Sequence, residues 1–422
     1  MKDIINTIIE NFKQGIVISY LNQSISIIYI FIVIYLFNII NGNIYYGQYI
    51  LLGSILSVVS SFSGLSSGEA VVYFLSKKKH DTFEILKCGF LIDLFFGLIL
   101  ILIVSLSVNY ISKFIDDIST QVIFLFGLRI VFKNLRNVVI GFWQFGNKFV
   151  LIYKINLIEN LFYVILLLST LLGFYEFNLI FLVKSEFLIT ILFTILTYLI
   201  FIRELIKKSF ISISNEHLSK KEFVIYNSKL FLSRTIKSGN QKFDNIIVGL
   251  FLSTNEVAIY DKIKKIFLPI NIFINPLREI FLPKLLNLVK SNNLNLIRSN
   301  IFVSTKIILF FSFLFLLFTN VFNKYIFDYL GIDYNLENSV IFYSLCYSTL
   351  YITFFWWARL LSNAFNPNLS IVANIISSLT ILSVTPLFLY IYGFIGLGFT
   401  VIVNSTILAV FWLSKFKKYV NN

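Results

Sequence analysis

Apolar residues follow one another in long runs along almost the whole chain, with short polar segments between them. A run of about 20 apolar residues suffices for a helix to cross a bilayer, and such runs are far too long for the strands of a membrane barrel. The pattern therefore predicts an all-α polytopic membrane protein. We expect about twelve transmembrane helices, at residues 16–40, 47–76, 88–112, 119–146, 149–173, 178–202, 223–251, 256–283, 299–322, 339–363, 368–391 and 393–414.

Turn-forming residues separate several of these runs. Asn41-Gly42-Asn43, Gly146-Asn147 and Tyr392-Gly393 each interrupt an apolar stretch, and such pairs commonly mark turns. The first run, 16–40, is too long for the apolar part of a signal peptide, so we interpret it as a spanning helix.

Basic residues are distributed very unevenly between the two sides of the predicted membrane. The chain has 35 Lys and Arg against 21 Asp and Glu, a net charge of +14. Nineteen of the basic residues fall in segments assigned to the cytoplasm, and only Lys113 and Lys324 fall on the opposite side. By the positive-inside rule this distribution places both termini in the cytoplasm. Topology thus accounts for the positive charge, and no nucleic-acid partner is expected.

The longest cytoplasmic connection falls at the middle of the chain, at about 203–222. It predicts two pseudo-symmetric six-helix bundles, residues 1–206 and 223–422, joined by a cytoplasmic linker at 207–222. Many transporters are built from two such halves.

Cationic side chains also recur inside the predicted spans. A Lys or Arg at the centre of a spanning helix costs about 2.5–3.5 kcal/mol, so most of these residues must face water, protein or an anionic ligand. Snorkelling to the interface or packing against other helices is the alternative for some of them. The candidate ligand-binding cations of a polar cavity are Arg129, Lys133, Arg136, Arg234, Lys237, Lys264, Arg278 and Arg359.

Carboxylates in the spans are fewer. Asp244, Asp93 and Glu159 are the candidates for balancing a cation or for changing protonation during transport. The chain contains no P-loop, no G-x-G-x-x-G opening a helix and no H-E-x-x-H. Its two cysteines, Cys88 and Cys346, lie far apart and predict neither a disulfide nor a metal site. We therefore expect no enzyme, metal or cofactor, and transport driven by an ion gradient, the substrate gradient or a partner.

Three short motifs resemble one known family. The stretch from Phe243 to Lys264, the segment Tyr46-Gly47-Gln48-Tyr49 and the segment Gly146-Asn147-Lys148-Phe149 resemble Wzx-type polysaccharide flippases. These belong to the multidrug/oligosaccharidyl-lipid/polysaccharide exporter superfamily, which has the MATE fold. The resemblance implies a central cationic cavity that moves an undecaprenyl-diphosphate-linked oligosaccharide from the cytoplasmic to the outer leaflet of the bacterial inner membrane. Surface polysaccharides such as the O-antigen of lipopolysaccharide would be the product of the pathway.

The resemblance also implies partners and a competing function. Membrane lipid, a coupling proton or sodium ion, the polysaccharide polymerase and its chain-length regulator are the candidate partners. The related lipid II flippases carry essential arginines in the first span and two further spans, and this chain has neither feature. The alternative is a MATE-type cation-coupled drug antiporter. That function requires buried acids, whereas cations outnumber acids in the spans here.

Overall fold

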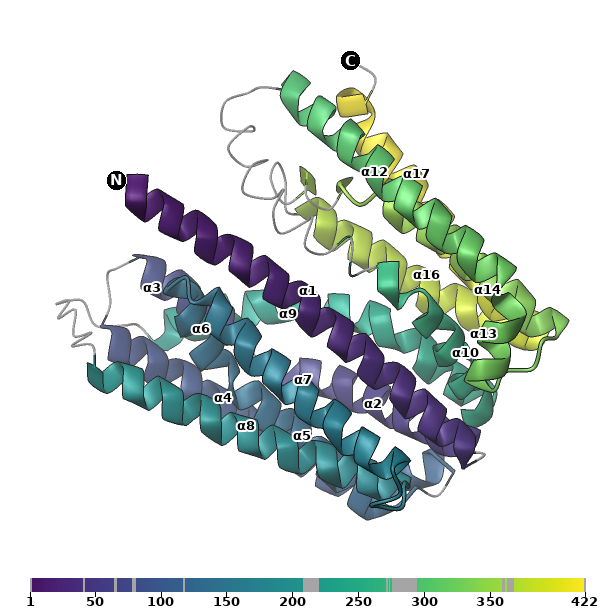
Figure 1. Cartoon of the computed structure of the whole chain (residues 1–422), viewed down its shortest axis with the longest axis horizontal. Helices are drawn as coiled ribbons and strands as arrows, with labels where there is room; N and C mark the ends of the chain where they lie inside the picture. Colours follow the sequence, from purple (N-terminus) through teal and green to yellow (C-terminus); the bar gives the residue numbers. More distant parts are fainter. Residues whose placement is uncertain are drawn as a thin grey trace. The chain divides into compact units, whose positions relative to one another are not determined.

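The computed structural model of the chain contains only helices and their connections among the residues that it describes (Figure 1). It describes residues 2–40, 42–63, 67–77, 81–116, 118–207, 220–270, 272, 274, 294–358, 361–362 and 368–420. Within these ranges, side chains are described except at 2–16, 61–63, 77, 207, 220, 229–241, 294–298, 300 and 416–420.

The chain forms two compact units. The first comprises 1–36 and 52–238, and the second comprises 37–51 and 239–422. In the first unit, α5 packs between α4 and α8, and α3 packs on α6. The helices of the first half are α1 (Lys2–Ile39), α2 (Asn43–Ser63), α3 (Ser67–Lys77), α4 (Thr82–Phe114), α5 (Thr120–Leu135), α6 (Asn137–Phe145), α7 (Phe149–Leu171), α8 (Leu179–Lys207) and α9 (Lys220–Phe251).

In the second unit, α17 packs on both α14 and α16, and α14 also contacts α10 and α12. Trp356, Trp357 and Trp412 are buried together in the core of this unit. Its elements are α10 (Thr254–Ile266), α12 (Leu294–Val321), α13 (Asn323–Leu330), α14 (Leu336–Phe354), α16 (Asn368–Tyr392), the 3₁₀ turn η1 (Gly393–Ile395) and α17 (Gly396–Val420).

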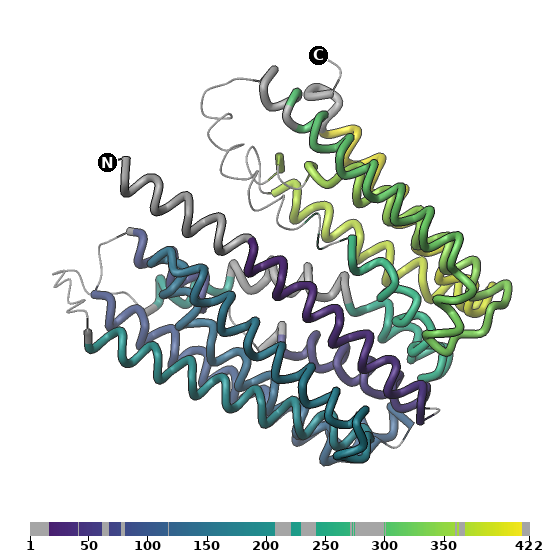
Figure 2. The backbone as a smooth tube through the Cα atoms, viewed as in Figure 1, coloured from purple at the N-terminus to yellow at the C-terminus, as the bar shows by residue number. Residues whose placement is uncertain are grey.

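Helix boundaries coincide with the turns expected from the sequence. The α1 helix ends at Ile39 and α2 begins at Asn43, on either side of the first predicted turn. Asn147 and Gly393 have φ angles of 56° and 58°, a left-handed conformation that Gly and Asn adopt most readily. The backbone trace in Figure 2 follows these interruptions between the long helices.

A close helix contact in the first unit depends on two glycines. A Cβ atom on Gly141 of α6 would lie 2.3 Å from the carbonyl oxygen of Gly68 in α3. A Cβ atom on Gly68 would likewise lie 2.5 Å from the carbonyl oxygen of Asn137. The two backbones therefore approach each other at a distance that only glycine permits.

The all-α membrane fold expected from the sequence is confirmed, although some of the predicted spans are interrupted. The expected helix 119–146 is divided into α5 and α6 at Arg136. The number of spans and the position of the termini stay predictions, as does the division at 207–222, since most of that linker lies outside the described residues. Six described stretches are long and apolar enough to cross a membrane: Val17–Ile39, Thr82–Phe114, Phe149–Leu171, Leu179–Ile206, Ile301–Val321 and Asn368–Lys415.

Candidate functional site

The interruption between α5 and α6 is stabilised by hydroxyl groups of α8. The Arg136 N–H donates to the carbonyl oxygen of Lys133, three residues back, so the carbonyl oxygen of Phe132 loses its usual helical donor. The Thr194 hydroxyl shares its hydrogen between this oxygen at 3.2 Å and the carbonyl oxygen of Thr190 at 2.7 Å. The Tyr198 hydroxyl donates to the carbonyl oxygen of Leu135 at 2.6 Å. The helix can therefore break inside a span without leaving a buried acceptor unpaired.

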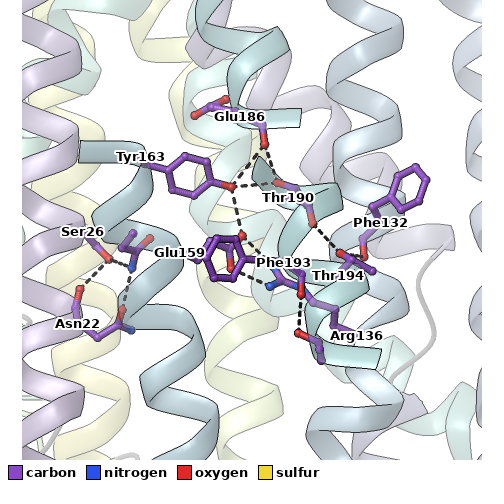
Figure 3. Close-up of polar contacts among 12 residues, drawn as sticks. Asn22, Ser26, Phe132, Arg136, Glu159, Tyr163, Glu186, Thr190, Phe193 and Thr194 are labelled. Carbon is purple, nitrogen blue, oxygen red and sulfur yellow. Dashed lines mark hydrogen bonds and ion pairs between the residues drawn. The ribbon is translucent and has the colours of Figure 1, made fainter. Parts of the chain in front are cut away.

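Arg136 lies at this break and pairs with Glu159 of α7 (Figure 3). Its two terminal nitrogens donate to the two carboxylate oxygens at 2.7 and 3.1 Å. The side chains are only 5% and 8% exposed. A bidentate pair of this kind satisfies both charges away from water.

Arg129, two turns earlier on α5, pairs with Glu186 of α8. The Tyr29 hydroxyl of α1 donates to the other oxygen of this carboxylate. Glu186 is 1% exposed and Arg129 is 17% exposed. Glu186 is thus held by an arginine and a tyrosine from two different helices.

Tyr163 of α7 links the carboxylate of Glu159 to the backbone of Glu186 (Figure 3). Its hydroxyl donates to Glu159 at 3.2 Å and shares a hydrogen bond of 2.9 Å with Thr190. The Thr190 hydroxyl also donates to the carbonyl oxygen of Glu186 at 2.8 Å. The two pairs therefore belong to one polar network inside the helices of the first unit, which we call the arginine–glutamate network.

Lys133 of α5 lies between Arg129 and Arg136 along the chain but has no carboxylate partner of its own among the described side chains. It is exposed, and it forms no hydrogen bond or ion pair among the residues whose side chains are described. Its ammonium group interacts electrostatically with Arg129, Arg136, Glu159 and Glu186. Three cations thus face two carboxylates, which leaves one net positive charge on Lys133.

A second polar cluster joins α1 to α7. The Asn160 side-chain amide donates to Asn22 at 2.7 Å and to Ser26 at 2.8 Å (Figure 3). No site residue was predicted in the first span, because this helix carries no charge in its apolar stretch. The polar residues Asn22, Ser26 and Tyr29 share one helical face, and this spacing was the available signal.

In the second unit, Asp244 of α9 pairs with Lys264 of α10 at 2.6 Å. The Tyr260 hydroxyl donates to the same carboxylate oxygen at 3.1 Å, and the Lys264 ammonium lies 4.9 Å from the Tyr260 ring centroid. Asp244 and Lys264 line a cavity of about 420 Å³. The arrangement places a balanced ion pair at the wall of this cavity.

Lys262, two residues before Lys264 on α10, was not among the predicted site residues. It is fully buried and donates to Asn38 at 2.6 Å, to Asn43 at 2.5 Å and to the carbonyl oxygen of Leu330 at 2.8 Å. The three acceptors are neutral oxygens that come from α1, α2 and α13. Lys262 therefore links the turn between α1 and α2, which belongs to the second unit, to α13 of the same unit. In the sequence, a lysine within the predicted span 256–283 indicated that a buried partner was needed, but its partners lie far away along the chain.

The remaining predicted site residues either lie away from these clusters or fall outside the part of the chain that the structure describes. Asp93 of α4 accepts a hydrogen bond of 2.5 Å from Ser67 of α3 and so joins two neighbouring helices. The side chains of Arg234 and Lys237 on α9, and the residues Arg278 and Arg359, lie outside the described part. Glu186, by contrast, is central to the network although it was not among the predicted site residues. The sequence did indicate a role for Glu186, because an acid within an apolar span requires a cationic partner.

The fold is shared with membrane proteins that transport small molecules or lipids. The MATE multidrug transporter DinF-BH superimposes with a TM-score of 0.71 at 12% identity, over 97% of this chain and 95% of its own. The lipid II flippase MurJ in an inward closed conformation gives a TM-score of 0.71 at 16% identity, over 95% and 87%. The Vibrio cholerae MATE transporter VcmN in its bent form gives 0.57 at 12% identity, over 98% and 99%. At these identities the likeness establishes a multi-pass membrane protein with the MATE fold.

Residues 45–331 match the family model described as polysaccharide biosynthesis protein. The match covers more than half of the chain, and the chain belongs to this family. The resemblance inferred from the sequence motifs is thereby confirmed. No curated protein sequence matches the chain.

Proposed function

We propose that this protein is a flippase for undecaprenyl-diphosphate-linked oligosaccharides. It would move the repeat units from the cytoplasmic to the outer leaflet of the bacterial inner membrane, as a step in surface polysaccharide biosynthesis. The observation that carries the proposal is an exposed lysine, Lys133, which lies beside two neutral arginine–glutamate pairs in a member of the polysaccharide-biosynthesis family.

The charge balance of this network supports an anionic substrate. Arg129 and Arg136 are each neutralised by a glutamate, so they add little free positive charge. Lys133 has no such partner among the described side chains and lies near the middle of the predicted span 119–146. Exposing it to lipid would cost about 2.5–3.5 kcal/mol. A diphosphate, which carries negative charge and several hydrogen-bond acceptors, is a suitable ligand for an ammonium group in such a place.

The competing proposal, a cation-coupled drug antiporter, is supported by the likeness to MATE transporters in fold alone. A cationic drug would need a free carboxylate. Glu159 and Glu186 are both held by arginines, and Asp244 is held by a lysine. The flippase is therefore the better-supported function. We include in this proposal a coupling ion and an association with a polymerase or chain-length regulator.

A deletion strain tests the function directly. We expect the strain to lose its surface polysaccharide and to accumulate lipid-linked repeat units that stay inaccessible from the outer face of the membrane. The wild-type gene should restore export, and a gene carrying Lys133→Gln should not. Intact surface polysaccharide together with increased drug sensitivity would instead favour the antiporter.

A further inference from the structure

The cavity of the second unit has features that the arginine–glutamate network does not share. Its volume of about 420 Å³ lies within the range of about 300–1,000 Å³ that small-molecule sites occupy. Its wall is formed by α10, α14, α16 and α17 together with Asp244 of α9. Much of this wall is apolar, with side chains such as Ile381, Leu397 and Val401.

The charged residues that line this cavity form ion pairs. Asp244 pairs with Lys264 at 2.6 Å. Lys265, the remaining charged residue of the wall, lies 3.6 Å from Asp261. The Tyr46 hydroxyl donates to the other oxygen of Asp261 at 2.8 Å. Each cation of the wall has a carboxylate partner, and Lys242 of α9 adds a third ammonium group that interacts electrostatically with Asp244 and Asp261. Since the charged groups of the wall are already paired with one another, recognition of a ligand in the cavity falls to its uncharged polar groups.

Two buried polar atoms in the wall have no hydrogen-bond partner among the described residues. They are the hydroxyl oxygen of Thr385 on α16 and the side-chain carbonyl oxygen of Asn404 on α17. Thr385 is only 1% exposed. A buried polar group without a partner is costly, so a native structure usually supplies one from water or from a ligand. Asn404 Oδ1 requires a donor, whereas the Thr385 hydroxyl can either donate or accept.

Further groups of the wall extend this polar surface. Ser348 and Thr349 of α14 and Ser405 of α17 contribute hydroxyl groups to the lining. The aromatic residues Tyr260 and Phe267 line the same space. Hydroxyl and amide groups combined with apolar and aromatic surface match a molecule that carries hydroxyls at its edge and C–H groups on its faces.

We propose that this cavity binds a neutral sugar ring of the transported glycan, with hydroxyls of the sugar donating to Asn404 and bonding to Thr385. The proposal rests on the proposed flippase function, because it assigns a site to the saccharide part of the same substrate. It separates recognition of the sugar in the second unit from the attraction of the diphosphate by Lys133 in the first.

The test compares two lipids on the purified full-length protein in lipid nanodiscs. One probe is the lipid-linked glycan extracted from the deletion strain, and the other is undecaprenyl diphosphate without sugar. We expect the wild-type protein to bind the glycan-linked lipid more tightly. The double variant Thr385→Val with Asn404→Leu should lose at least about tenfold in affinity for the glycan-linked lipid, as expected for lost hydrogen bonds in a buried site. Its affinity for undecaprenyl diphosphate should not change.

A matched variant on the same helix controls for damage to the fold. Thr380 is also a buried threonine of α16, but its hydroxyl donates to the carbonyl oxygen of Ile376 and it does not line the cavity. Thr380→Val should bind both lipids as the wild-type protein does. Since Thr385 has no partner to lose, Thr385→Val should also unfold at an unchanged or higher temperature.

The outcomes separate this inference from the function on which it rests. If the double variant keeps the preference for the glycan-linked lipid, the cavity holds water only and the inference is wrong, while the flippase function stands. Equal binding of both lipids by the wild-type protein would also overturn the inference. If the wild-type protein binds neither lipid, the proposed function fails as well.

Discussion

Removing one partner of the Arg136–Glu159 pair should damage the protein far more than removing both. The pair is bidentate, with distances of 2.7 and 3.1 Å, and its side chains are 5% and 8% exposed. Arg136→Met leaves the Glu159 carboxylate buried without its cation. Breaking a buried pair in this way costs about 3–5 kcal/mol, a large part of a typical stability of about 5–15 kcal/mol.

The double variant Arg136→Met with Glu159→Met removes both charges at once. Replacing a buried ion pair by apolar side chains of similar volume is often neutral or stabilising. We therefore expect the double variant to unfold within about 1 kcal/mol of the wild-type protein, well below the summed loss of the two single variants. The non-additivity measures the interaction between the two side chains.

Thermal and denaturant unfolding of the purified protein in detergent, followed by tryptophan fluorescence, gives the four free energies of this cycle. Surface polysaccharide in the complemented deletion strain gives the corresponding export. If the single variants were as stable as the wild-type protein, the pair would not be buried as the structure places it. Additive losses in the double variant would likewise refute a specific interaction between the two residues.

Three further predictions follow from individual contacts. Lys133→Gln should abolish export with normal folding, because this exposed lysine has no ion-pair partner among the described side chains; export is measured by surface polysaccharide, with the exposed Lys184→Gln of α8 as the control. Lys262→Met should lower the free energy of unfolding by about 3 kcal/mol, because three acceptors lose a fully buried charged donor. Gly141→Ala should lower the unfolding temperature, because its new Cβ would lie 2.3 Å from a backbone oxygen. Gly146→Ala is its control, since the nearest atom to a Cβ there is 3.6 Å away.

Each of these predictions has a result that would contradict it. Normal export by Lys133→Gln would mean that the net charge of the network lies elsewhere. A Lys262→Met protein as stable as the wild type would mean that its three acceptors find other donors. Equal unfolding temperatures for the two glycine variants would show that α3 and α6 can separate at no cost.

Much of the secondary structure was predictable because its causes are local. Long apolar runs indicate spanning helices, and the left-handed conformations of Asn147 and Gly393 follow from which residues tolerate a positive φ. The break at Arg136 was not predictable in this way. It depends on hydroxyl groups from Thr194 and Tyr198, which lie about 60 residues away.

The sequence by itself determined that this is a helical membrane protein, because its long apolar runs suit spanning helices. It also determined that Arg129, Lys133 and Arg136 share one side of a predicted span and avoid lipid, because helical periodicity sets the side and the cost of charge in lipid excludes exposure there. Only the tertiary structure decided which of these cations are neutralised. The packing of α7 and α8 against α5 brings Glu159 and Glu186 to the two arginines and leaves Lys133 without a carboxylate among the described side chains. The physical reason is that the free charge at a site depends on distances between side chains on different helices, and spacing along one helix carries no information about those distances.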